Sequence, residues 1–284
     1  MFTLLHSFHP QPILLSFGPL TIYWYGLFIV LGILAALAVT FYLAKRYEIK
    51  RDKIFDLVFW LIIGGLIGAR VYDIFLQLPY YIEHPLQTLQ IWKGGLAIHG
   101  AIIAGLIIIW FFVRKQKINF WKLTALMTPG LALGQAIGRW GNYFNQELFG
   151  LPTNLPWGIP IDVINRPLNY LSAQFFHPTF LYESIGNFLI FIILITANIC
   201  FFRRHNNEEN SGTKTAASRF YVWITALYMI LYSILRFTLE FIRVDEAPSI
   251  LGLRWPQIIS LIIIILFTLI LSFRSHAPKT KNRQ

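Results

Sequence analysis

Charged residues are scarce in this chain of 284 residues: they make up 13% of it, against about a quarter of a soluble domain. Hydrophobic residues make up 56% and lie in long runs, which excludes an ordinary soluble globular domain. The single cysteine, Cys200, excludes a disulfide within the chain and a cysteine-bound metal cluster. Because Cys200 ends an apolar run, we interpret it as a small buried hydrophobe and not as a nucleophile.

Several common motifs are also missing. The chain contains neither HExxH nor GxSxG, which argues against the usual zinc peptidases and serine hydrolases, and no repeat has a fixed period. The first 17 residues hold no Lys or Arg and are interrupted by Pro10 and Pro12, so we do not predict a removable signal peptide. The net charge is +11, and the basic residues responsible for it lie between the apolar runs, which favours a membrane over nucleic acid as the partner.

The apolar runs predict an all-α, polytopic membrane protein built as a bundle of seven transmembrane helices. A spanning helix needs about 20 largely apolar residues. The seven candidates are Thr21–Ala44, Ile54–Phe75, Gly95–Val113, Leu123–Tyr143, Pro178–Phe202, Phe220–Ile242 and Pro256–Phe273.

Basic residues alternate between the connecting loops. Every second loop, together with the C-terminal tail, holds 17 of the 24 Lys and Arg residues. The positive-inside rule therefore predicts an outer N-terminus and a cytoplasmic C-terminus. We expect one integral membrane domain over 1–284, with an outer-face loop segment at about 144–177. The Pro-rich part of this segment fits a lid or a plain connector equally well, and the polar loop 205–218 should be mobile on the cytoplasmic side.

Residues 138–150, GRWGNYFNQELFG, place many polar groups at the end of the fourth apolar segment. Arg139 and Asn142 are three residues apart and share a helical face. A guanidinium binds phosphate oxygens in a fork, so Arg139 is a candidate phosphate ligand, although an Arg–Glu pair that only joins helices is the structural alternative. Gly138 and Gly141 should permit a close approach. Further polar or small candidates of this motif are Asn145, Glu147 and Gly150.

Three more groups of polar residues occur where the apolar segments should leave hydrocarbon, and ionisable residues in a span indicate function. Tyr232, Arg236, Glu240 and Arg243 are spaced 4, 4 and 3 apart and predict one helical stripe. His99 starts the third segment, where a neutral imidazole can accept a proton. The remaining candidates are His177, Tyr182 and Glu183 before and in the fifth segment, Tyr25 in the first and Arg70 in the second.

Arginines, carboxylates and a histidine at one depth indicate a site for an anionic head group, with acid–base chemistry at hand. The alternative from another class is a membrane transporter for an anionic lipid or metabolite. A proton-coupled transporter usually has its site at the midplane between related halves, and no such halves are recognisable.

These residues carry a family resemblance. GRWGNYFNQELFG resembles the signature of the bacterial prolipoprotein diacylglyceryl transferases, and YWYG, GARVYD, GGLAIHG, HPTFLYE and RFTLEFIR follow the family's order. The resemblance implies transfer of the diacylglyceryl group from phosphatidylglycerol to the lipobox cysteine thiol of a preprolipoprotein signal peptide. A thioether forms and glycerol phosphate leaves, without a metal or organic cofactor. It also implies the bacterial plasma (inner) membrane, with the site facing its periplasmic or outer side.

With this resemblance, we expect Arg139 and Arg236 to clamp the phosphate and His99 to deprotonate the thiol, with Glu240 or a water chain as the alternative base. Tyr25, Tyr232 and Glu240 would position the head group or the arginines. Asn142, Glu147 and Gly150 would shape the phosphatidylglycerol site. Supporting positions are Arg70, Asn145, His177, Tyr182, Glu183 and Arg243.

Overall fold

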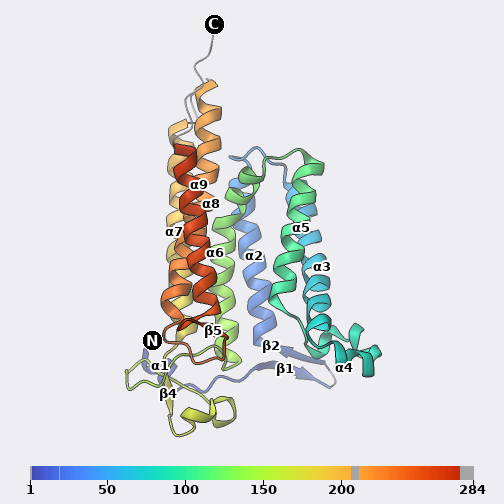
Figure 1. The fold of residues 1–284 in the computed structure, drawn as a ribbon, viewed down its shortest axis with the longest axis vertical. Helices are drawn as coiled ribbons and strands as arrows, with labels where there is room; N and C mark the ends of the chain where they lie inside the picture. Colours follow the sequence, from blue (N-terminus) through green and yellow to red (C-terminus); the bar gives the residue numbers. More distant parts are fainter. Residues whose placement is uncertain (1, 19, 206–210, 276–284) are drawn as a thin grey trace. The chain divides into compact units, whose positions relative to one another are not determined.

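The computed structural model describes residues 2–18, 20–205 and 211–275. The described chain is mostly helical (Figure 1). It forms two compact units, of which the first contains residues 1–40 and 124–284 and the second contains residues 41–123. Each unit is described by itself.

Six helices in the described part of the chain are long and apolar enough to cross a membrane, so the protein is a polytopic membrane protein. They are α2 (Trp24–Ala44), α3 (Arg51–Leu76), α5 (Ile98–Gln116), α7 (Thr179–His205), α8 (Ser211–Leu239) and α9 (Trp255–Ser275). The predicted segment Leu123–Tyr143 forms the helix α6 (Phe120–Phe144), which is not among these six. It contains Lys122, Pro129 and Arg139, which lower its apolar content. Seven spanning helices therefore stay a prediction.

The structure corrects several predicted boundaries. Residues 20–23, assigned mostly to the first helix, form the strand β2 (Leu20–Tyr23), which pairs antiparallel with β1 (Ile13–Phe17). Residues 95–97 precede α5 because Gly94 and Gly95 have φ angles of 93° and 71°, outside the helical region.

The beginning of α8 is a further correction. Because α8 starts at Ser211, residues 211–218 of the predicted mobile loop are helical, and residues 206–210 lie outside the described residues. The interpretation of Cys200 as a buried side chain is also wrong, since Cys200 is exposed on α7.

In the first unit, small residues allow α2 and α6 to pack closely. A Cβ atom added at Gly134 would lie 3.0 Å from the carbonyl oxygen of Gly32, and one added at Gly130 would lie 2.5 Å from that of Ala36. Close packing at small residues is a common way for membrane helices to associate. In the same unit α7, α8 and α9 pack as neighbours (Figure 1).

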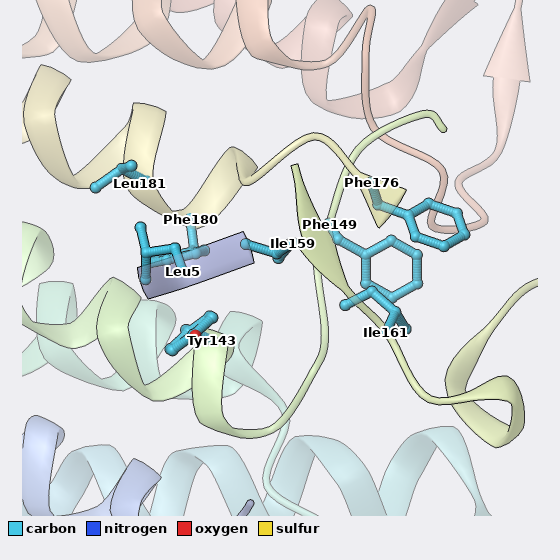
Figure 2. Close-up of a cluster of buried hydrophobic side chains, with 8 residues drawn as sticks. All are labelled: Leu5, Tyr143, Phe149, Ile159, Ile161, Phe176, Phe180 and Leu181. Carbon is cyan, nitrogen blue, oxygen red and sulfur yellow. The ribbon is translucent and has the colours of Figure 1, made fainter. Parts of the chain in front are cut away.

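Residues 151–177 fold onto the ends of α6 and α7. The segment contains β3 (Ile159–Pro160), the 3-10 turns η3 (Val163–Asn165) and η4 (Leu168–Tyr170), and β4 (Phe175–Phe176), which pairs antiparallel with β3. Figure 2 shows the apolar cluster that it buries with α1 (Phe2–Ser7). The cluster comprises Leu5, Tyr143, Phe149, Ile159, Ile161, Phe176, Phe180 and Leu181. Burial of this much apolar surface fixes the segment against the helix ends that carry the polar motifs. Another short hairpin, β5 (Ser249–Ile250) with β6 (Leu253–Arg254), precedes α9.

In the second unit α3 and α5 pack along a line of small residues. A Cβ atom added at Gly68 would meet the Cβ of Ala104 at 2.5 Å and the carbonyl oxygen of Gly100 at 2.6 Å. Along the chain, α3 is followed by α4 (Leu78–Glu83) and by the 3-10 turns η1 (Pro85–Leu89) and η2 (Ile91–Lys93), which precede α5.

Candidate active site

Glu183, in the first turns of α7, lies at the centre of a buried ion-pair network in the first unit. Its side chain is 2% exposed. Its Oε1 lies 2.6 Å from Arg139 Nη2, and its Oε2 lies 3.6 Å from Arg236 Nη1 and 3.7 Å from Arg243 Nη1. One carboxylate therefore joins arginines from α6, from α8 and from the segment after α8. The sequence predicted only a supporting role for this residue.

Glu240, just beyond the end of α8, forms the second centre of the network. Its side chain is 1% exposed, and its Oε2 accepts a hydrogen bond from Arg236 Nη2 at 3.0 Å, one helical turn away as the spacing predicts. Arg254 Nη1 lies 3.4 Å from Glu240 Oε1. Buried carboxylates and guanidinium groups offset their desolvation only when they are paired, which explains why this network is so extensively connected.

Asp245 and Arg254, which were not predicted from the sequence, complete the network. Arg243 Nε lies 2.8 Å from Asp245 Oδ1, while Arg254 donates to the carbonyl oxygens of Asp245 and, at 3.0 Å, of Arg243. The only available signal was weak: Arg254 is one of the few basic residues in a loop that is otherwise poor in positive charge.

Asn142 links Arg139 to Glu147. Arg139 Nη1 donates to Asn142 Oδ1 at 3.2 Å, and Asn142 Nδ2 donates to Glu147 Oε1 at 2.7 Å. The predicted shared face of Arg139 and Asn142 is thus confirmed. Glu147 can return to this position because the chain turns sharply after α6, with a φ of 52° at Gln146 and 56° at Leu148.

Asn145 lies beside the network and not inside it. Asn145 lines a depression of about 390 Å³, together with Glu147, Leu148, Val244, Asp245 and other residues. The adjacent Gln146 is buried and donates to Pro10 O at 2.9 Å and to Asp162 Oδ2 at 2.7 Å. These contacts tie the N-terminal segment and the 151–177 segment to the end of α6.

Tyr25 contacts the same end of α6. A Cβ atom added at Gly141 would lie 2.8 Å from Tyr25 Cδ2, so the predicted close approach at Gly141 is confirmed. At Gly138 the nearest atom to an added Cβ would be Ile29 Cδ1 at 3.9 Å, an ordinary contact, so no backbone packs tightly there and the approach of a ligand stays a prediction. Tyr232, half-buried on α8, interacts electrostatically with Glu183 and Arg139.

Gly150 lies where three segments of the first unit cross. Its N–H donates to the carbonyl oxygen of His177 at 2.9 Å, and it forms a bridge with Arg243. A Cβ atom at Gly150 would lie 2.8 Å from both His177 Cβ and Ile242 O. A side chain larger than hydrogen at Gly150 would therefore collide with His177, Thr179 and the backbone just before Arg243.

His177 and Tyr182 form a contact beside this crossing. The Nδ1 atom of His177 lies 3.2 Å from the Tyr182 hydroxyl, which also accepts a hydrogen bond from Trp157 Nε1 at 2.8 Å. Burial lowers the pKa of His177, because it disfavours the charged imidazolium.

His99 and Arg70 belong to the second unit. His99 lies in the first turn of α5, is exposed, and its ring centroid is 6.0 Å from that of Tyr72. Arg70 is buried and organises the loop before α5. It donates to the carbonyl oxygens of Gln87, Thr88, Gly94 and Gly95. These bonds use all of its nitrogen atoms, so Arg70 holds this loop, and its supporting role at the site stays a prediction.

The carboxylate beside Arg70 strengthens the same loop. Asp73 Oδ2 lies 3.8 Å from Arg70 Nη1 and accepts a hydrogen bond from the Tyr81 hydroxyl at 2.8 Å. This hydrogen bond to Asp73 raises the pKa of Tyr81. Among the described residues, no group of three or more His, Cys, Asp or Glu side chains is placed to hold a metal ion.

Comparison with known proteins adds the family. The model of the family described as prolipoprotein diacylglyceryl transferase matches residues 12–273, which is most of the chain. The chain belongs to this family. Two similar relatives are the phosphatidylglycerol–prolipoprotein diacylglyceryl transferases of a Nostoc and a Synechocystis species. The first is 43% identical over 253 residues, covering 89% of this chain and 85% of the relative. The second is 42% identical over 260 residues, covering 91% and 87%. The predicted resemblance to the prolipoprotein diacylglyceryl transferases is thereby confirmed.

Proposed function

We propose that this chain transfers the diacylglyceryl group of phosphatidylglycerol to a prolipoprotein, the reaction after which its relatives are named, and that the Glu183 network binds the reacting phosphate. The observation that carries the site assignment is the pairing of Arg139 and Arg236 with one buried carboxylate. Their own side chains remain 21% and 16% exposed, so both can still donate hydrogen bonds to a ligand.

The reaction explains why such arginines are needed. The thiolate of the lipobox cysteine attacks the terminal glycerol carbon of the diacylglyceryl group, a C–S bond forms, and the C–O bond to the phosphate breaks. The departing glycerol phosphate takes the electron pair and gains negative charge. Arg139 and Arg236 would stabilise that charge, because preorganised cations act most strongly where charge develops in a site of low polarity.

The carboxylates would hold the arginines in place before the lipid arrives. Glu183 fixes Arg139 and Arg236 relative to each other, while Asn142 and Glu147 fix the other edge of Arg139. Glu240 is buried against Arg236 and Arg254, which favours a positioning role over proton transfer. Gly150, Tyr25 and Tyr232 would shape the head-group site around them.

We assign deprotonation of the thiol to His99. Only the thiolate attacks well, and an ordinary thiol has a pKa of about 8.5. His99 is exposed in the first turn of α5, and an imidazole can act as a general base. The test is the pH profile of His99→Gln. A rate and profile equal to those of the unmodified chain would exclude His99 and leave Glu240 or a water chain.

The proposed setting is the bacterial plasma membrane, with seven spanning helices in one membrane domain, an outer N-terminus and a cytoplasmic C-terminus. The alternation of basic loops supports this orientation. The network and the 144–177 segment would then lie at the periplasmic or outer face, at the depth of lipid head groups.

One assay tests the function directly. Purified protein, phosphatidylglycerol vesicles and a peptide with a lipobox cysteine should yield a peptide heavier by one diacylglyceryl group, together with glycerol phosphate. A transporter would instead move an anionic lipid or metabolite across a vesicle membrane and leave the peptide unmodified, and that pair of results would overturn the proposal.

A further inference from the structure

Asn187, on α7, is a buried amide that the proposed reaction has not used. Its exposed fraction is 0%, and neither Nδ2 nor Oδ1 has a hydrogen-bond partner among the described residues. Asn198, further along the same helix, is equally buried but donates to Leu194 O at 2.8 Å. Buried polar groups are normally paired, so an amide with both atoms unpaired needs an explanation.

The position of Asn187 connects it to the ion-pair network. It follows Glu183 by four residues, so it lies on the same face of α7 and about 6 Å further along the helix axis. At this level a Cβ atom at Gly186 would come within 2.6 Å of Leu235 Cδ1 of α8. Ser184 Oγ donates to Ala136 O of α6 at 2.7 Å. Asn187 thus lies near the meeting of α6, α7 and α8, one turn further into the apolar span than Glu183.

The chemistry of an amide narrows the class of ligand. Nδ2 donates and Oδ1 accepts, so one group that satisfies both must offer an acceptor and a donor. Phosphate and ester oxygens only accept, and the hydroxyls of a glycerol head group, which can do both, lie on the side of the phosphate that faces away from the apolar span. A peptide unit offers both, and a polypeptide that enters hydrocarbon in an extended form must find partners for its own N–H and C=O groups.

We propose that Asn187 binds a backbone peptide group of the acceptor polypeptide, among the four residues that precede the reacting cysteine. This assignment rests on the proposed function, since the polypeptide must place its thiol beside Arg139 and Arg236 while the preceding residues run deeper. Because Asn187 is fully buried, docking has to part side chains of α7 from those of α6 or α8. Asn187 is then the residue that sets how far the acceptor enters the site.

The experiment combines one substitution with a change in the peptide backbone. Full-length protein and Asn187→Leu are assayed in phosphatidylglycerol vesicles with acceptor peptides in which one amide is replaced by an ester at each of the four positions before the cysteine. With the unmodified chain, the ester at one of the four positions should raise the KM for the peptide about tenfold. This is the effect expected from the loss of one or two hydrogen bonds. Asn187→Leu should raise the KM for the all-amide peptide about as much and show no further loss at that position.

The unfolding temperature distinguishes a role of Asn187 in binding the acceptor from a purely structural role. Removing an unpaired buried amide should leave the unfolding temperature of Asn187→Leu unchanged or higher. The matched control, Asn198→Leu, loses a formed hydrogen bond, so it should unfold at a lower temperature and keep the full effect of the backbone ester.

Two results would overturn the proposal. One is an equal loss from the backbone ester in Asn187→Leu and in the unmodified chain. The other is a defect that appears in the KM for phosphatidylglycerol and vanishes with a diether analogue, which would assign Asn187 to a lipid ester. Absence of any product from the unmodified chain with the all-amide peptide would instead show that the proposed function has failed.

Discussion

Arg139 of α6 and Glu183 of α7 form the shortest ion pair of the buried network, with Nη2 and Oε1 2.6 Å apart. The carboxylate is almost fully buried, whereas the arginine keeps about a fifth of its side chain exposed. This asymmetry suits a guanidinium that a buried carboxylate fixes on one side and that can bind a phosphate on its exposed side.

Arg139→Ala should lower the rate of diacylglyceryl transfer by about 10²–10³-fold, because one preorganised contact to the leaving phosphate is lost. Arg139→Lys should recover only a small part of the rate, since an ammonium group cannot contact Glu183, Asn142 and a ligand in the same fork. Product formation by mass spectrometry measures both. Arg114→Ala is the control, because Arg114 is exposed and stacks on Trp110 in the second unit. A normal rate in Arg139→Ala would contradict the phosphate assignment.

Glu183→Gln should destabilise the protein strongly. The substitution leaves Arg139, Arg236 and Arg243 without their shared carboxylate, and breaking a buried ion pair from one side costs about 3 kcal/mol or more. Thermal unfolding in detergent measures the change. In the matched control, Glu48→Gln, the carboxylate is 86% exposed and pairs with Lys122 at 3.6 Å, so the unfolding temperature should hardly move. Equal shifts in the two variants would mean that the Glu183 pairs contribute little.

Contacts within one helix could be predicted from the sequence, whereas contacts between helices could not. Helical spacing predicted the Arg139–Asn142 and Arg236–Glu240 contacts, because residues three or four apart on a helix must face the same side. The central place of Glu183 depends on which faces of α6, α7 and α8 meet. Spacing within one helix carries no information about that arrangement.

Loop contacts were harder still to foresee. Asp245 and Arg254 enter the network through turns after α8 and before α9, and Gln146 joins Pro10 and Asp162 across long stretches of sequence. The small residues that bring α2 close to α6 were visible as GILAA and PGLALG. Their pairing nevertheless required the structure.

Gly150→Ala should reduce activity and stability together. The added methyl group would press on Ile242 O and on the side chains of His177 and Thr179, and the bridge to Arg243 would shift. We expect a loss of about 1–3 kcal/mol, the usual range for overpacking a tight site. Gly26→Ala is the control, since nothing lies within 4 Å of a Cβ atom on that helical residue. Its stability should be unchanged or slightly higher, because alanine favours the helix. A Gly150→Ala protein as stable and active as the control would exclude the steric role.

Arg70→Lys should loosen the loop between α4 and α5 without unfolding the second unit. Lysine carries one nitrogen and cannot replace a guanidinium that donates to four carbonyl oxygens at once. Hydrogen exchange of the backbone amides in residues 84–97 should therefore accelerate by about tenfold or more. The α3–α5 contact at Gly68 and Gly100 should keep its protection, because it does not involve Arg70. Arg51→Lys, an exposed residue whose guanidinium stacks on Phe41, should leave the loop unchanged. If exchange in the loop were the same in Arg70→Lys as in the unmodified chain, Arg70 would not be the residue that fixes this loop.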